Sequence, residues 1–279
     1  MTVRYELVGV DAPNSPHHTW EFGAPDCPLR LATTPTGLGG APMVHARQSN
    51  ARQAGASWRG RNDDINLVGL DVWIGPVPPA QALDLWKAWR QSLGRGDRLA
   101  EFHVHSEVGS TVSHTWQYVR LEKEMPAPDF AALEALGEVR EQAELTSDES
   151  WWRSQSVAPP AYTPAELAGK TITNSGDVPT WMFYELTGPG TFTVGANGEY
   201  HTLPALAAGE VWHIETDSEN PYIRNAAGVN KWNLVGLKAW YQPIPAGETV
   251  PLNLSVTGSN ADTRVRVELP QRHTTAVPL

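Results

Sequence analysis

The stretch from Lys170 to Leu269 constrains the fold more than any other part of the sequence. Apolar residues occupy every second position from 250 to 256 and again from 265 to 269, with polar residues or proline between them. Strict alternation of this kind predicts strands that bury one face and expose the other. The intervening segment 257–262 is rich in turn residues, so the two strands are predicted to pair as a hairpin.

The rest of the second half repeats short β-rich runs separated by Gly, Asn or Pro turns. Further strands are predicted at 171–173, 181–187, 191–194, 200–203, 211–216 and 222–224. Eight or more short strands without helical periodicity predict a β-sandwich of jelly-roll type. No nucleophile, base and oxyanion donors are grouped in this stretch, so we expect it to hold a shape and present a surface.

The first half contains one clear helical pattern among predicted strands. Apolar residues recur at helical spacing, with Pro79 in the first turn and Gly94 as the stop, and predict a helix over 80–93. Strands are predicted at 3–10, 99–105 and 115–124. The alternation changes phase at Val68-Gly69, which predicts a β-bulge or a corner at Gly69.

Two further segments decide the organisation of the chain. Residues 129–146 fit either a helix or a strand that begins after Gly137, and we favour a short helical turn followed by a strand over 138–146. Residues 154–164 have the proline-rich composition of a linker, which places a domain boundary near residue 157. The sequence therefore predicts a mainly β protein with an N-terminal domain, 1–156, that has one helix, and a C-terminal β-sandwich, 157–279.

Composition excludes several classes of partner. The net charge of the 279 residues is −10, divided as −6 over 1–156 and −4 over 157–279, and no basic stripe was recognised. Such a chain is not expected to bind nucleic acid or an anionic membrane. No apolar run approaches the roughly 20 residues of a membrane span, so no membrane insertion is expected. A start at Met1 without a basic and apolar leader predicts folding in a cytoplasm.

Few residues suggest a metal site. The single cysteine, Cys27, excludes an intramolecular disulfide and a Cys-rich zinc site, and we expect it to have no catalytic role. His103, His105 and Glu107 share one phase of a predicted strand and could bind zinc or form a pH-sensitive patch. A polar strand face at a subunit interface is the favoured interpretation. His17-His18 is a loop pair whose side chains point apart, which does not favour metal binding.

The remaining motifs do not form a catalytic set. The carboxylate pairs Asp63-Asp64 and Asp217/Glu219 are better explained by turn capping than by glycoside hydrolysis. The segment 37–40, Gly-Leu-Gly-Gly, lacks the lysine of a phosphate-binding loop, and the tripeptide 95–97, Arg-Gly-Asp, follows a predicted helix end and indicates capping. We therefore predict no catalytic residue, cofactor site or metal ligand, and a protein that is not an enzyme.

The tryptophans leave two interpretations open. The chain has 12 Trp and only 5 Phe, and Trp181, Trp212, Trp232 and Trp240 fall in the second half. They could form a platform on which sugar rings stack, or they could fill the sandwich core and subunit contacts. Protein contact is the favoured interpretation.

The order of short motifs along the chain resembles the distal tail proteins of siphophages. In the second half the matching elements are the segments 174–179 (Asn-Ser-Gly-Asp-Val-Pro), 186–190 (Leu-Thr-Gly-Pro-Gly), 206–217 and 241–248. In the first half they are 59–65 (Arg-Gly-Arg-Asn-Asp-Asp-Ile), the helix over 80–93, 118–121 (Tyr-Val-Arg-Leu) and 147–153. The sequence departs from the family at 214–217, Ile-Glu-Thr-Asp, where the family more often has Ile-Asp-Thr.

The resemblance implies a structural virion protein. Its N-terminal domain would assemble into a hexameric ring that joins the tail tube to the tail tip or baseplate, and its C-terminal domain would be an outward sandwich similar to galectins and carbohydrate-binding modules. The implied partners are other copies of the chain, the tail-tube, tape-measure and tail-tip or receptor-binding proteins, and a host surface glycan. The implied location is the distal end of a phage tail, assembled in the host cytoplasm. The alternative is a carbohydrate-binding module for host cell-wall glycan, and a third hypothesis is a hydrolase.

Overall fold

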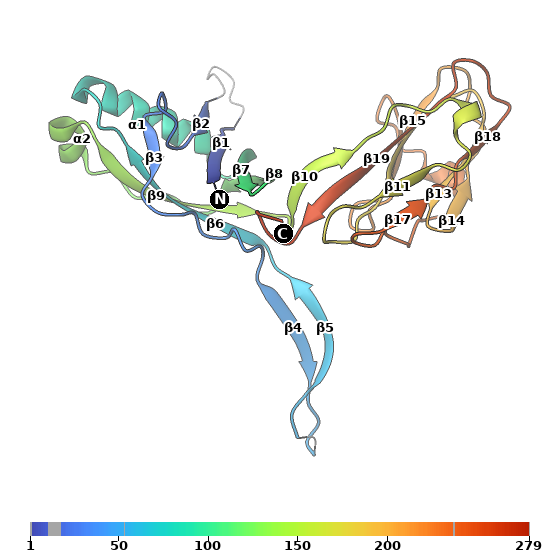
Figure 1. Cartoon of the computed structure of the whole chain (residues 1–279), viewed down its shortest axis with the longest axis horizontal. Helices are drawn as coiled ribbons and strands as arrows, with labels where there is room; N and C mark the ends of the chain where they lie inside the picture. The colour runs from blue at the N-terminus through green and yellow to red at the C-terminus, as the bar shows by residue number, and fades with distance from the viewer. Residues whose placement is uncertain (1, 11–17, 53, 237, 279) are drawn as a thin grey trace. The chain divides into compact units, whose positions relative to one another are not determined.

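The chain is mainly β, as the sequence predicts, and it folds into two compact units. The computed structural model describes residues 2–10, 18–52, 54–236 and 238–278. Unit 1 comprises residues 1–153 together with 274–279, and unit 2 comprises residues 154–273. Chain order in unit 1 is β1 (Thr2–Val8), β2 (Thr19–Glu21), β3 (Leu29–Leu31), β4 (Met43–Gln48), β5 (Ser57–Asp63), β6 (Asn66–Ile74), α1 (Pro79–Leu93), β7 (Ala100–Val108), β8 (Thr111–Leu121), α2 (Phe130–Leu136) and β9 (Val139–Ser147), as Figure 1 shows.

Strand β10 (Trp152–Val157) runs from unit 1 into unit 2. Unit 2 continues with a 3-10 turn (Pro164–Glu166), β11 (Thr171–Thr173), β12 (Phe183–Thr187), β13 (Thr191–Ala196), β14 (Glu199–Thr202), β15 (Val211–Glu215), β16 (Tyr222–Asn225), α3 (Trp232–Val235), β17 (Thr249–Pro251), β18 (Ser255–Thr257) and β19 (Arg264–His273).

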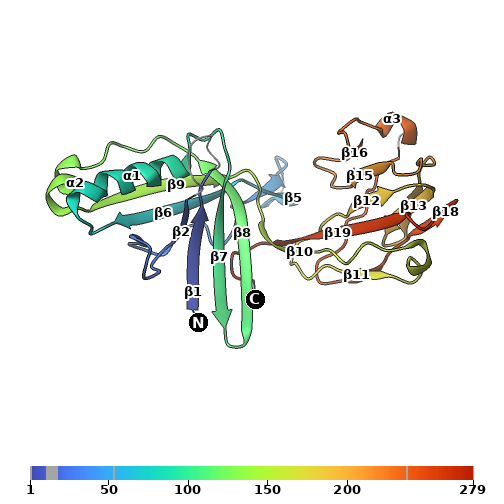
Figure 2. The same ribbon diagram turned by 90° about the horizontal axis from the view of Figure 1, so that it is seen from above.

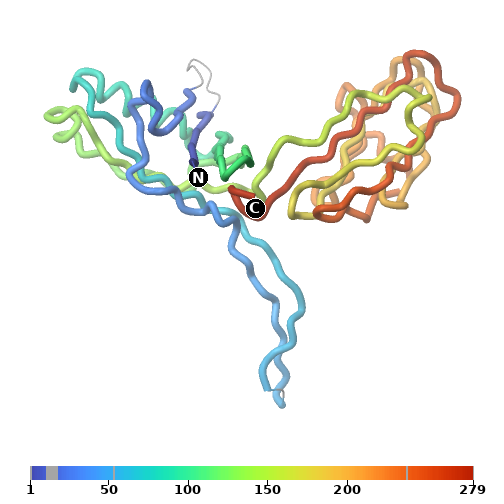
Figure 3. Tube along the Cα trace, in the orientation of Figure 1, coloured from blue at the N-terminus to red at the C-terminus, as the bar shows by residue number. Residues whose placement is uncertain are grey.

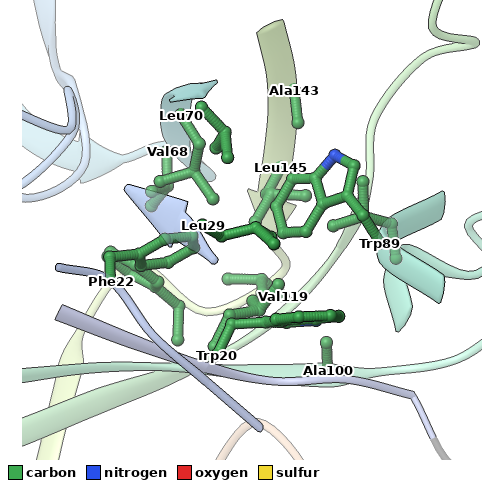
Figure 4. Close-up of a cluster of buried hydrophobic side chains, with 14 of the residues drawn as sticks. Trp20, Phe22, Leu29, Val68, Leu70, Trp89, Ala100, Val119, Ala143 and Leu145 are labelled. Carbon is green, nitrogen blue, oxygen red and sulfur yellow. The ribbon is translucent and has the colours of Figure 1, made fainter. Parts of the chain in front are cut away.

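Two antiparallel sheets and α1 enclose the core of unit 1. One sheet has the order β2-β1-β7-β8, and the other has the order β3-β6-β9, whose last strand also pairs with the end of β8. Inward residues alternate along each strand, as expected for sheets with one buried face. On α1, Trp89 is fully buried and meets Trp20 and Phe22 edge-on at ring-centroid distances of 6.5 and 6.1 Å (Figure 4). These aromatic contacts fix the helix against the sheets.

Unit 1 contains the helix predicted from the sequence and one further helix. The 80–93 prediction is confirmed by α1, which starts with Pro79 at its first position and ends at Gly94. The expectation of a single helix is incomplete, because α2 is a second one, and the favoured helical turn before a strand at 138–146 is confirmed by α2 and β9. Asp129 caps α2 by accepting hydrogen bonds from two backbone amides, and Gly137 ends it at φ 67°.

The predicted bulge at Gly69 is wrong. Strand β6 pairs with β9 in unbroken register from Asn66 to Ile74, and Leu67 is exposed rather than buried. A glycine is required for a different reason. Thr36 packs against Gly69, with its amide donating to the Gly69 carbonyl and its hydroxyl accepting from the Gly69 amide, so a Cβ would strike the hydroxyl.

A two-stranded arm, defined as residues 43–63 and formed by β4 and β5, leaves the body of unit 1 (Figures 1 and 3). Every residue of β4 is exposed, and no residue of β5 is buried. This element is not among those predicted from the sequence.

Unit 2 is a sandwich with a single buried core. Strands β16-β15-β12-β19 form one sheet (Figure 2), and a two-stranded sheet, β11-β17, and a three-stranded sheet, β14-β13-β18, contribute to the other side. Large side chains from both sides, such as Tyr184, Trp212 and Phe192, are buried in one cluster. The predicted hairpin between 250–256 and 264–269 is wrong: β17 pairs with β11, β18 pairs with β13, and β19 pairs with β12.

The chain crosses between the units twice. Residues from 157 onward were all predicted to belong to the second domain, whereas the compact units divide at 153/154 and residues after 273 return to unit 1. There Ala276 is fully buried, its amide donates to the Leu38 carbonyl at 2.9 Å, and its carbonyl accepts from the Thr115 hydroxyl at 2.5 Å. Unit 2 is therefore an insertion within unit 1.

Candidate functional site

The arm is the most exposed feature of unit 1. Between residues 27 and 62 the sequence has five arginines and no acidic residue, and four of these arginines lie on the arm. The chain as a whole carries −10, so the arm is a local basic element in an acidic protein. Charge summed over each half of the chain hides this local excess, which is why it does not point to a basic stripe.

One face of the arm combines an aromatic ring with cations. Arg47 and Trp58 are direct cross-strand partners, and His45 lies opposite Arg61. Trp58 is 64% exposed, and its indole nitrogen donates to His45 Nδ1 at 3.1 Å. Tryptophan and arginine are the residue types that most often dominate the energy of protein interfaces. This face has the chemistry of a contact surface.

The root of the arm is fixed to the body. The Asp64 amide donates to the Pro42 carbonyl at 3.0 Å, and the Ser150 hydroxyl donates to the Asp64 carbonyl at 2.7 Å. Asp63 pairs with Arg61 at 2.8 Å, and one Asp64 carboxylate oxygen accepts from the next backbone amide. The Asp63-Asp64 pair thus holds the turn at which the arm joins β6, in line with its predicted capping role.

Two strand edges of unit 1 have no strand partner among the described residues. Strand β1 pairs with β7 over its whole length, but β2 covers only its end from Glu6 to Val8, and the next residue, Phe22, donates its amide to the Tyr5 carbonyl at 3.0 Å, which leaves residues 2–4 open. On the opposite side of the sheet, β8 contacts β10 at Trp116 and β9 at Arg120 and Leu121, and Thr115 is buried against Ala276, which leaves residues 111–114 open. The register places these two open edges at the same end of the sheet. Unpaired edges are templates for pairing with another chain.

A cluster of three imidazoles lies on the outer face between these edges. His105 and His114 are cross-strand partners whose rings stack at 4.2 Å with an interplanar angle of 5°. His103 Nδ1 lies 2.9 Å from His114 Nε2, and the other His103 nitrogen lies 3.0 Å from a Glu101 oxygen. Glu6 on β1 lies 3.5 Å from His105. The predicted pair of histidines is therefore part of a larger group that the sequence analysis did not assemble.

Within the cluster, His114 favours the uncharged imidazole. Burial, and next to it the proximity of His105 and His103, lowers the pKa of His114. The stacked rings direct their in-plane nitrogen lone pairs side by side rather than toward one point, and among the described residues no group of three or more His, Cys, Asp or Glu is arranged to hold a metal ion. Glu107, the third member of the predicted patch, is exposed on the same strand.

The other candidate residues predicted from the sequence take part in contacts that support the fold. His17 lies outside the described residues, and the His18 ring stacks on Trp20 at 5.3 Å. Asp217 forms an ion pair with Arg272 at 2.5 Å, and its other oxygen accepts from the Glu219 amide, which makes a turn rather than a catalytic pair.

Structural roles also explain three further motifs: the glycine-rich segment, the Arg-Gly-Asp tripeptide and the cysteine. At Gly37 and Gly40 the backbone adopts positive φ, and a Cβ at either position would collide with a backbone carbonyl. The tripeptide 95–97 lies in the turn directly after α1. Cys27 is half-buried, and burial raises the pKa of its thiol, which opposes the reactive thiolate form.

The tryptophans of unit 2 do not form one platform. Trp212 and Trp240 are 2% and 6% exposed, and their indole nitrogens donate to Glu210 and to the Val194 carbonyl. Trp181 and Trp232 are half-buried. The four-ring interpretation as a sugar-stacking surface is therefore wrong, because two of the rings belong to the core.

No described helix has the length and apolar character needed to cross a membrane. The fold and the surfaces above define a mainly β protein of two units, one inserted into the other, with an exposed basic arm and open strand edges. No family model matches the sequence, and no curated protein matches it.

Solved structures with the same fold come from phage adsorption machinery. The SPP1 Dit protein, described as a paradigm of the hub adsorption apparatus in phages that infect Gram-positive bacteria, aligns over 96% of this chain and 98% of its own, with a TM-score of 0.58 and 8% identity. Chains of the phage P2 baseplate in its activated conformation, solved with Ca and with Sr, align over 97% of this chain and 98% of theirs, each with a TM-score of 0.55 and 8% identity. Both units of the chain therefore have counterparts in one solved fold.

Proposed function

We propose that this protein is the distal tail hub of a bacteriophage of siphovirus type, a structural virion component without enzymatic activity. The observation that carries the proposal is the nearly full-length similarity to a phage hub protein, which includes the inserted sandwich as well as unit 1. A fold can serve several functions, so the surfaces of the chain must also suit the role. The surfaces of unit 1 suit it, because its open strand edges and its exposed arm can contact a second subunit.

The proposed mechanism is assembly into a closed ring. The open edge of β8 and the open edge of β1 lie on opposite sides of one sheet, so contact between them joins different surfaces of two copies. Heterologous contacts of this kind close into rings when the rotation between copies allows it. We propose a ring of six copies between the tail tube and the tail tip, with unit 2 available for tail-tip or receptor-binding proteins.

The proposed location follows from this role. The ring belongs at the distal end of the tail in the virion, where it meets tail-tube and tape-measure proteins, and it assembles in the host cytoplasm. The arm supports the proposal, because none of its described residues has a buried side chain, and such residues gain little stability from packing on the body that carries them. Such a segment is suited to contact with another subunit.

The oligomeric state of the purified full-length chain tests the proposal. We expect sedimentation and electron microscopy to show closed rings that grow with concentration. Replacing residues 44–62 by a two-residue turn should leave the melting temperature nearly unchanged, because no described residue of the arm is buried, and should weaken ring formation. A wild-type chain that stays monomeric at the highest accessible concentration would contradict the proposal.

A further inference from the structure

Three imidazoles meet on the outer face of the sheet β1-β7-β8, and we define His103, His105 and His114 as the imidazole cluster. The rings of His105 and His114 stack across β7 and β8 at 4.2 Å, and the His103 ring lies 5.1 Å from His114 and 6.4 Å from His105. Figure 2 shows these strands side by side, with the turn that joins β7 to β8 at the free end of the hairpin. Imidazole is the side chain whose ordinary charge change falls between about pH 5 and 8. The cluster therefore gathers three groups that can change charge near neutral pH.

The hydrogen bonds within the cluster are satisfied by uncharged rings. His103 Nε2 lies 3.0 Å from a Glu101 oxygen, and only an N–H can donate to this ionised carboxylate. In a neutral His103 the other nitrogen, Nδ1, is then an acceptor, so we assign the hydrogen of the 2.9 Å contact to His114 Nε2. When His103 and His114 are both charged, an N–H faces an N–H across this contact and the hydrogen bond is lost.

Carboxylates accompany only two of the three rings. Glu101 lies beside His103, and Glu6 on β1 lies 3.5 Å from His105. Among the described residues, His114 forms no ion pair with a carboxylate. A proton on His114 therefore adds a positive charge that is stacked on His105 and has no neighbouring countercharge. In agreement, burial and then the proximity of the other two rings lower the pKa of His114.

The other charged groups on this face do not supply the missing countercharge. Two of them are arginines that already have carboxylate partners, and the carboxylate of Glu107 lies at the exposed end of β7, where solvent screens its charge. The groups from all neighbouring strands are Arg4 of β1 with its partner Glu21 of β2, Arg153 of β10 with its partner Glu149, and Glu107 itself. Full protonation of the cluster therefore leaves an excess of positive charge.

The cluster borders the open edge of β8. His114 is the last of the open residues 111–114, which pair only with β7 among the described residues. None of residues 107–114 is buried, so backbone pairing and the Ser106–Ser113 hydroxyl contact at 2.7 Å hold this end of the hairpin. Segments with few buried contacts open most readily. Repulsion between His105 and His114 therefore acts on the part of the sheet that resists it least.

We propose that the imidazole cluster is a proton-operated switch of self-association: with uncharged rings residues 111–114 keep an ordered strand edge, and with charged rings the end of the β7–β8 hairpin opens and this edge is lost. The inference rests on the proposed ring and adds the regulation of one of its contacts. Because the folded hairpin disfavours the charged form, association is fully present above about pH 6.5 and is lost as pH falls below it.

Hydrogen exchange in the full-length chain tests the opening of the hairpin without reference to the ring. The chain is measured at about pH 7.5 and about pH 5.5, on either side of the ordinary imidazole range, at a dilution at which it is monomeric. Rates are corrected for the pH dependence of chemical exchange. Amides of residues 105–116 should lose at least about tenfold in protection at the lower pH, while those of β6 and β9 change less than about twofold. Unchanged protection of residues 105–116 overturns the switch and leaves the proposed function standing.

The variant His114→Gln removes the ring that has no countercharge and keeps a neutral amide that can donate to His103. Position 114 is exposed, so the variant should fold as the wild type does. Its residues 105–116 should keep the same protection at both pH values within about twofold. The matched control is His213→Gln in unit 2, which removes a strand imidazole that lies 3.3 Å from Glu185. This control should keep the wild-type response to pH.

Sedimentation of the full-length chain links the switch to assembly. Between about pH 7.5 and about pH 5.5 the wild type and the His213→Gln control should lose at least about tenfold in association, whereas His114→Gln should lose less than about threefold. An equal loss in His114→Gln means that another group responds to pH and overturns the inference, as does wild-type association that is independent of pH. Binding of added zinc that is lost in His114→Gln would identify a metal site and also overturn it. A wild-type chain that never associates overturns the proposed function and this regulation with it.

Discussion

Removing the carboxylate of Glu141 is expected to destabilise unit 1 severely. Glu141 is 5% exposed and accepts two hydrogen bonds from the Arg90 guanidinium, at 2.8 and 2.6 Å, and one from the Trp86 indole at 2.8 Å. Arg90 also donates to the carbonyls of Met125 and Pro126. One side chain on β9 therefore holds α1 and the segment that leads to α2.

The expected magnitude follows from the burial of the pair. In Glu141→Ala the guanidinium, whose side chain is only 22% exposed, loses its counter-charge, and such a loss typically costs about 3–5 kcal/mol. Replacing both partners by apolar residues, as in Arg90→Met with Glu141→Leu, removes the unpaired charge. The double variant should lose only about 1–2 kcal/mol, from the unpaired indole and carbonyl groups.

The assay must report on unit 1 separately from unit 2. Hydrogen exchange of peptides from β6 and β9 in increasing urea gives the free energy of unfolding of unit 1, while peptides from β12 and β15 report on unit 2. The control is Glu144→Ala on the same strand, which breaks the exposed pair with Lys123 at 2.8 Å and should cost at most about 1 kcal/mol. A loss under about 1 kcal/mol for Glu141→Ala, or a double variant as unstable as the single one, would refute the reasoning.

Three further predictions concern stability. Trp212→Ala should destabilise unit 2 by about 3–5 kcal/mol in urea unfolding, because the ring lies in the core, and a loss under about 1 kcal/mol would place it elsewhere. Because the pKa of His114 is lowered in the folded chain, the unfolded chain binds protons more readily. The stability that unit 1 has with a neutral His114 is therefore fully present above about pH 6.5 and is lost as pH falls. In His114→Gln the melting temperature of unit 1 should depend less on pH between about pH 5 and 7, and an unchanged slope would contradict this. Gly137→Ala should cost about 1–3 kcal/mol, because φ is 67° and a Cβ would collide with the Val77 carbonyl, whereas Gly109→Ala, also at positive φ but in open space, should cost less.

Sequence patterns predicted the strands of unit 2 because each strand has one buried and one exposed face. They did not predict the partners. Val250, Leu252 and Leu254 keep their alternation and are all buried, yet the Leu252 amide donates to Lys170 and the Asn253 amide to Gly195. The segment therefore changes sheets without changing the face it buries, and alternation reports burial only.

The surfaces of unit 1 were harder to predict from sequence. Alternation requires a buried face, and the arm has none, so its strands carry no apolar period. The histidine cluster was within reach of sequence reasoning, because strands are predicted at 99–105 and 115–124 and these segments pair in the structure. A tight turn at Gly109-Ser110 places His114, one residue before the second predicted strand, opposite His105.

The return of the chain to unit 1 has a consequence for the order of events during synthesis. Ala276, which fills a buried position beside Thr115, follows unit 2 in the sequence. At 5–20 residues per second, the 120 residues of 154–273 delay its arrival by about 6–24 s. Unit 1 therefore lacks its last segment until the sandwich has been translated. In the proposed ring, the unit that carries the ring contacts would therefore be completed only after the unit inserted into it.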